Sequence, residues 1–95
     1  MPEMHFRVRW PDGAVENCYS PSLVIKDHFQ PGETYSLDEF LARSRTALKI
    51  ASDRVEAKYG FPCSLALGQL ARIEFGCARF AASSEADVSI ESFEE

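Results

Sequence analysis

The stretch from Ser36 to Gly60 constrains the fold more than any other, because it predicts a long amphipathic helix with both ends encoded. At its start, Ser36-Leu37-Asp38-Glu39 has the capping-box form, in which the serine hydroxyl accepts an unpaired backbone N–H and the glutamate reaches back to the cap residue. Gly60 tolerates the left-handed position that ends a helix, and Pro62 prevents continuation. The residues between them form one apolar stripe, as a core-facing helix requires: Leu37, Phe40, Leu41, Leu48, Ala51 and Val55.

A second helix is predicted from Leu65 to Phe80, with Ser64 as its cap. Its apolar residues form two faces. The first face contains Ala66, Leu70, Ile73, Cys77 and Phe80, and the second contains Leu67, Ala71, Phe75 and Ala78. A helix that is apolar on two faces is either sandwiched within the fold or pairs with another chain, so Leu67, Ala71 and Phe75 are candidate interface residues. Gly68 and Gly76 each lower helix propensity by about 1 kcal/mol relative to alanine, which indicates close packing at these positions.

The segment 4–10 has the strongest strand pattern, because the apolar residues Met4, Phe6, Val8 and Trp10 alternate with polar ones. These four side chains should face the core. Pro11-Asp12-Gly13 follows and predicts a turn, in which proline presets its backbone angle and glycine takes a positive φ. A hairpin into Ala14–Ser20 is therefore expected.

Two registers are open for this hairpin. A two-residue turn at Asp12-Gly13 sets Arg9 opposite Glu16 and turns Val15 and Tyr19 toward the core. A type I turn with Gly13 as a bulge shifts the pairing by one residue, and then Cys18 and Ala14 face inward. We favour the bulged form, because Pro11 lacks the N–H that the tighter hairpin needs.

The other segments are short. A helical turn is expected after Ser20-Pro21-Ser22, and Glu33-Thr34-Tyr35 is an extended lead into the long helix. Ser83-Ser84-Glu85 predicts a loop, and Asp87–Glu91 alternates as a final strand. The order ββ(turn)ααβ predicts an α+β fold, a two-layer sandwich in which the final strand docks beside the hairpin and two helices cover one face of a small antiparallel sheet.

The length of 95 residues is enough for one domain, residues 1–95, with an acidic tail at about residues 92–95 that should be solvated and frayed. The net charge of −5 argues against a nucleic-acid partner. We expect no leader and no membrane span, and the three widely spaced cysteines are typical of free thiols in a reducing cytoplasm.

The open face of the sheet is the predicted binding surface. His5, Arg7 and Arg9 form a small basic stripe there, suited to a carboxylate or phosphate, although such a stripe is also an ordinary solvated face when carboxylates balance it. Cys18 lies on the neighbouring strand, so a Cys–His nucleophile with His5 is conceivable. In the competing interpretation, Cys18 is a small core residue.

Several catalytic and cofactor sites are not supported by the sequence. The glycines are scattered singly, so no phosphate-binding loop can be written, and neither His5 nor His28 has a partner at metal-ligand spacing. We therefore expect no cofactor, no metal and no catalytic residue.

The sequence resembles a family of small bacterial nitrogen starvation response proteins, encoded near a nitrilase-type hydrolase, and the resemblance covers nearly the whole chain. The stretches that carry it are Met1–Trp10 with Pro11-Asp12-Gly13, Cys18–Val24, Ala51–Val55 with Lys58–Phe61, and Leu70–Glu74. It implies a bacterial, cytoplasmic protein expressed with a small biosynthetic or nitrogen-scavenging gene set, and it assigns no catalytic residue.

Two functions are consistent with these observations. The first is a non-catalytic accessory or binding protein of a nitrogen-limitation pathway, which associates with a protein partner or with itself through the second helix or the open sheet face. The alternative is a small enzyme, or the ligand-carrying subunit of one, that uses Cys18 with the His5, Arg7 and Arg9 face.

Overall fold

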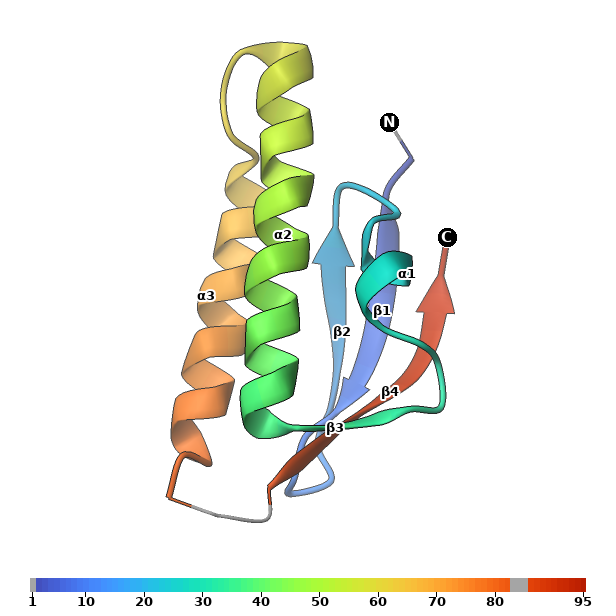
Figure 1. The fold of residues 1–95 in the computed structure, drawn as a ribbon, viewed down its shortest axis with the longest axis vertical. Helices are drawn as coiled ribbons and strands as arrows, with labels where there is room; N and C mark the ends of the chain where they lie inside the picture. The colour runs from blue at the N-terminus through green and yellow to red at the C-terminus, as the bar shows by residue number, and fades with distance from the viewer. Residues whose placement is uncertain (1, 83–85) are drawn as a thin grey trace.

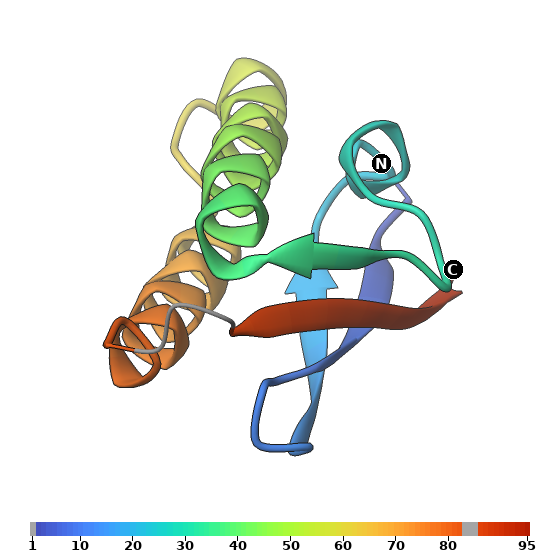
Figure 2. The same cartoon turned by 60° about the horizontal axis from the view of Figure 1, so that its bottom comes forward.

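The computed structural model, which describes residues 2–82 and 86–95, has one four-stranded antiparallel sheet with its helices on one side (Figures 1 and 2). The strand order is β2-β1-β4-β3, so the first and last strands of the chain pair at the centre of the sheet. The predicted α+β sandwich is confirmed. The predicted loop at Ser83–Glu85 lies outside the described residues. The elements are β1 (Met4–Arg9), β2 (Val15–Ser20), α1 (Ile25–His28), β3 (Thr34–Ser36), α2 (Leu37–Tyr59), α3 (Ser64–Arg79) and β4 (Asp87–Glu94).

The hairpin adopts the bulged register. The N–H of Gly13 donates to the carbonyl of Trp10, Gly13 has a φ of 87°, and Cys18 pairs with Phe6 and is buried. The inward position expected for Ala14 is wrong, because its side chain is exposed. Ala14 sits at the hairpin end, which projects away from the helices (Figure 2).

Helix α2 has the predicted ends. Ser36 accepts the N–H of Glu39 at 3.2 Å, and Gly60 adopts a left-handed φ of 90°. Of the predicted stripe, Phe40, Leu48 and Ala51 are buried. Leu37, Leu41 and Val55 are half-buried. The far end of the helical hairpin extends past the sheet (Figure 1), so less of the core reaches that end of the helix.

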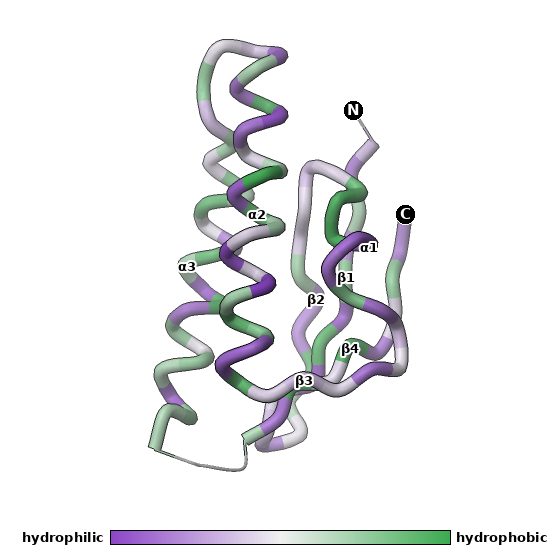
Figure 3. The backbone as a smooth tube through the Cα atoms, in the orientation of Figure 1, coloured by the Kyte–Doolittle hydropathy of each residue, from purple (hydrophilic) through white to green (hydrophobic). Residues whose placement is uncertain are grey.

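Helix α3 begins one residue earlier than predicted, with Cys63 at the cap position and no side-chain cap bond. Its first apolar face is turned inward, toward α2 and β2, with Ala66, Ile73 and Cys77 buried. The green apolar segments in Figure 3 lie largely where the two helices, α1 and the sheet meet. The core therefore occupies the space between the helix layer and the sheet.

The final strand is longer than expected, since β4 continues to Glu94 and places most of the acidic tail in the sheet. The pairing of β1 with β4 shifts between Arg7 and Val8, which marks a β-bulge. Ile90 faces the core before the bulge and Phe93 packs against it afterwards. The extra residue thus reverses the alternation of the strand.

Candidate functional site

The basic stripe of the open sheet face is present but largely neutralised. Arg9 Nε donates to Glu91 Oε2 at 2.8 Å, and Arg9 Nη1 donates to the carbonyl of Gly13 at 3.1 Å. Arg7 Nε lies 3.7 Å from Glu91 Oε1. Glu91 faces outward because it follows the buried Ile90, and it is the extra residue of the β4 bulge, which leaves it beside both arginines. The stripe is therefore balanced by a carboxylate of β4.

A shallow hollow remains on this face beside His5 and Arg7. It has a volume of about 310 Å³, and its lining also includes Val15, Asn17, Ser92 and Glu94. Glu94 pairs with His5 in the sheet, which places an acidic group at the same hollow. Arg9 does not contribute to the lining. The structure brings His5 and Arg7 together, but it commits Arg9 to Glu91 and the turn.

Cys18 lies on the opposite face of the sheet from His5. Neighbouring residues of a strand point to opposite faces, and Cys18 pairs with the core residue Phe6 whereas His5 pairs with Tyr19. The thiol is 0% exposed, and burial, with Glu16 beside it, raises its pKa above the ordinary range. A nucleophilic thiolate needs the reverse, a depressed pKa and access to substrate. The structure does not assemble a Cys18–His5 pair.

The two other cysteines also lie outside the sheet face. Cys63 is half-buried at the start of α3, and its N–H donates to Ser52 Oγ at 3.1 Å. Cys77 is buried, and burial raises its pKa to about 11.

A polar cluster lies between β2 and α3, and the sequence analysis did not predict it. Its centre is Gln69, which is fully buried; its Oε1 accepts the N–H of Tyr19 at 3.0 Å and Arg72 Nη2 at 2.8 Å. Gln69 Nε2 lies 3.4 Å from Glu16 Oε2, and Glu16 Oε1 accepts Trp10 Nε1 at 3.1 Å. The sequence signal was a glutamine among the apolar residues of α3, at a position that faces the core.

The cluster has a consequence for the sheet. Strand β2 is an edge strand, and an unpaired edge invites another strand to join it. The outward N–H of Tyr19 donates to Gln69 Oε1, so one backbone donor of this edge already has a partner within the chain.

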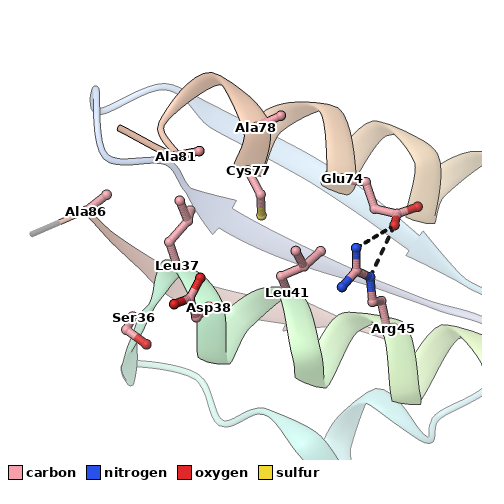
Figure 4. A pocket seen from close by; sticks show the side chains of 10 residues that line it. All are labelled: Ser36, Leu37, Asp38, Leu41, Arg45, Glu74, Cys77, Ala78, Ala81 and Ala86. Atoms are coloured by element: carbon pink, nitrogen blue, oxygen red, sulfur yellow. Dashed lines mark hydrogen bonds and ion pairs between the residues drawn. The ribbon is translucent and has the colours of Figure 1, made fainter. Parts of the chain in front are cut away.

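A cleft lies between the start of α2 and the end of α3 (Figure 4). It measures about 430 Å³, and Figure 4 shows the Cys77 thiol directed toward α2 beside Leu37 and Leu41. Arg45 and Glu74 bridge the two helices at its edge, with Arg45 Nη2 3.0 Å from Glu74 Oε2. Arg45 and Glu74 are already paired with each other. The described lining also contributes the carboxylate of Asp38 and the buried thiol of Cys77.

The second apolar face of α3 is exposed to solvent. Phe75 is 71% exposed and Leu67 is 46% exposed, and Ala71 and Ala78 are exposed as well. Tyr59, Phe61 and Leu65 add further exposed apolar area at the tip of the hairpin. The candidate interface residues therefore lie together on the outside of the helix layer.

Within residues 2–82 and 86–95, no group of three or more histidine, cysteine, aspartate or glutamate side chains is arranged to hold a metal ion. Helices in this same part of the chain are too short or too polar to cross a membrane.

The model of one protein family, nitrogen starvation-induced protein NitG, matches residues 5–93. The chain belongs to the NitG family. No curated protein and no solved structure matches it. The NitG match runs from β1 into β4 and includes the basic stripe, Cys18 and the exposed face of α3. The family description names an induction condition, nitrogen starvation, and assigns no chemistry to any of these residues.

Proposed function

We propose that this protein is a non-catalytic accessory protein of the bacterial nitrogen-starvation response, which works in the cytoplasm by binding another protein. The observation that carries the proposal is the exposure of Phe75, which is 71% exposed on the apolar outer side of α3. We define the outer face of α3 as Leu67, Gly68, Ala71, Phe75 and Ala78.

The outer face of α3 is unusual because it carries no charged residue. Successive residues of an α-helix are about 100° apart, so these five positions fall within an arc of about 100°. A helix that packs one face on a core normally presents charged and polar residues on the opposite side. Burying an exposed phenylalanine contributes about 1.5–3 kcal/mol, which gives a partner a strong reason to cover Phe75.

The positions of the thiols support an accessory role over catalysis. Cys18 is separated from His5 by the sheet and its pKa is raised by burial. Arg9 is held by Glu91 and the carbonyl of Gly13. The alternative function, a small enzyme using this thiol with the basic stripe, would require β2 to turn Cys18 outward.

The family gives the biological setting of the proposal. Membership in the NitG family supports a role under nitrogen starvation. We extend this to a gene set that includes a nitrilase-type hydrolase, because the resemblance of the sequence implies that neighbourhood.

Complementation of a deletion strain tests the proposal. Recovery after nitrogen withdrawal is compared for strains that produce the wild type, Phe75→Glu, or the double variant His5→Ala with Cys18→Ala. We expect the double variant to restore recovery and Phe75→Glu to fail, with circular dichroism showing that both are folded. Full recovery with Phe75→Glu, or loss of recovery with a folded double variant, would overturn the proposal.

A further inference from the structure

We infer that the surface proposed above is covered by a second copy of this chain, which lies antiparallel along the α2–α3 hairpin about a two-fold axis. This inference rests on the proposed function, because it names the occupant of the same helical surface. The observation that selects a second copy is the order of charges along α2.

Four charged residues of α2 line one side of the groove between α2 and α3: Arg45, Lys49, Asp53 and Glu56. They are separated by four, four and three residues, so they form one stripe on the helix. The two cations stand toward the start of the helix and the two anions toward its end. We call these four residues the charge stripe.

The order of the charge stripe is self-complementary. When two identical helices pack antiparallel about a two-fold axis, the same flank of each helix meets in reverse order. Lys49 then stands opposite Asp53 of the partner subunit, and Arg45 stands opposite Glu56 of the partner subunit. Every cation meets an anion, and symmetry repeats each pair. A parallel arrangement would instead bring like charges together.

The charges are available for this role. The side chains of Arg45, Lys49 and Asp53 are 56%, 74% and 57% exposed. Within one chain Lys49 pairs with Asp53 at 3.2 Å and Arg45 pairs with Glu74 at 3.0 Å. Pairs this exposed contribute little in isolation, so their exchange for contacts across an interface costs little.

Apolar surface lies next to the charge stripe. The groove has a volume of about 420 Å³, and Pro62, Leu67 and Leu70 form its apolar part. Leu67 also begins the outer face of α3, and Ala71 lies between it and Phe75 along that face. Phe75 itself lines a neighbouring hollow of about 380 Å³ on the other side of α3. The hairpin stands to one side of the sheet (Figure 2), which leaves this surface free along its length.

The sheet edges are poorer sites for a second copy. On the β2 edge, the N–H of Tyr19 already donates a hydrogen bond to Gln69. The other edge, β3, has only three residues, from Thr34 to Ser36. Short and internally satisfied edges discourage strand addition.

The size of the surface is sufficient for a dimer that depends on concentration. Helix α3 has 16 residues and is therefore about 24 Å long, and two helices side by side are about 20 Å wide. Each copy thus offers about 500 Å² and the pair about 1,000 Å², which is below the range of about 1,200–2,000 Å² for stable interfaces and fits a weak dimer.

Charge reversal on purified full-length chains tests the inference, with molar mass measured by sedimentation equilibrium over a concentration series. Lys49→Glu sets a carboxylate against Asp53 of the partner subunit, and Asp53→Lys sets two ammonium groups together. We expect each variant alone to dimerise about tenfold more weakly than the wild type. An equimolar mixture of the two should recover a dimer of wild-type strength.

If each substitution weakened the dimer only by disturbing its own chain, the mixture would be as weak as its components, because each chain keeps its substitution. Recovery on mixing therefore shows that positions 49 and 53 meet across the interface. Lys58→Glu is the matched control: it makes the same change of charge on α2 outside the stripe, and should dimerise like the wild type. Circular dichroism of each variant verifies folding.

The outcomes separate this inference from the proposed function. A wild type that stays monomeric at every concentration, or a mixture no stronger than its components, would overturn the second copy. The accessory role would still stand if Phe75→Glu failed to restore recovery after nitrogen withdrawal, and the occupant would then be a different protein.

Discussion

Gly76 of α3 lies directly against the indole of Trp10, so closely that a Cβ built on Gly76 would stand 2.6 Å from Trp10 Cη2. The ring cannot easily move away. It stacks on Phe80 with centroids 6.2 Å apart, meets Phe40 edge-on at 5.6 Å, and donates its N–H to Glu16. This contact fixes the distance between α3 and the sheet.

The contact predicts opposite effects for alanine at the two helical glycines. Gly76→Ala should lower the free energy of unfolding by about 1–3 kcal/mol, because the added methyl overpacks the core. Gly68→Ala should raise it by about 0.5–1 kcal/mol, since its Cβ would meet no atom within 4 Å and alanine favours the helix. Urea denaturation at one fixed protein concentration measures both. Equal effects of the same sign would contradict the contact.

Gln69→Ala should destabilise the protein by about 1–3 kcal/mol, because it leaves the Tyr19 N–H without its partner and opens a cavity at a buried position. The matched control is Arg72→Ala, which removes an exposed member of the same cluster and should cost less than about 1 kcal/mol. Thermal unfolding followed by circular dichroism compares them. A smaller effect at Gln69 than at Arg72 would show that the edge of β2 is not secured by this side chain.

The three cysteines should differ in reactivity. In the native protein a thiol-specific reagent such as DTNB should label Cys63 alone, since Cys18 and Cys77 are buried. The Cys63→Ser variant should then show no fast labelling, and all remaining thiols should react in denaturant. Fast native labelling of Cys18 would mean that β2 adopts the other register.

Stability should fall in mild alkali. Burial raises the pKa of Cys18 above its ordinary range and that of Cys77 to about 11. In the unfolded chain both thiols ionise near pH 8.5, so above that pH the unfolded state binds fewer protons than the folded one. The stabilisation is complete below about pH 8.5 and declines as pH rises toward the folded pKa values, by up to about 1.4 kcal/mol per pH unit for each thiol.

Urea denaturation between pH 7.5 and 10 measures this slope, with Cys18→Ala as the comparison. The variant is less stable at neutral pH because of its cavity, but its stability should fall less steeply with pH. An identical slope would show that Cys18 ionises equally in both states.

Local signals predicted much of this fold. The cap at Ser36, the terminator at Gly60 and the proline-aspartate-glycine turn act through nearby backbone geometry, so α2 and the hairpin register could be read from short segments. The strand β3 was predicted only as an extended lead, because its pairing with β4 joins segments more than fifty residues apart.

The candidate site was harder to predict, for related reasons. Alternation within β4 places Glu91 on the exposed face, but its position beside Arg7 and Arg9 depends on the pairing of β4 with β1 and on the bulge in that pairing, which a single segment does not reveal. The role of Gln69 depends on an N–H of another element. The second apolar face of α3 was visible as a pattern, but only the structure places Phe75 outside the core.

The central claim is that the protein acts through the outside of its helical hairpin, and the most direct test is the molar mass of the wild type and Phe75→Glu by sedimentation equilibrium across concentration. We predict that the wild type passes from monomer to dimer as concentration rises, while folded Phe75→Glu stays a monomer throughout. Identical behaviour of the two proteins would contradict the claim that this face binds a second copy.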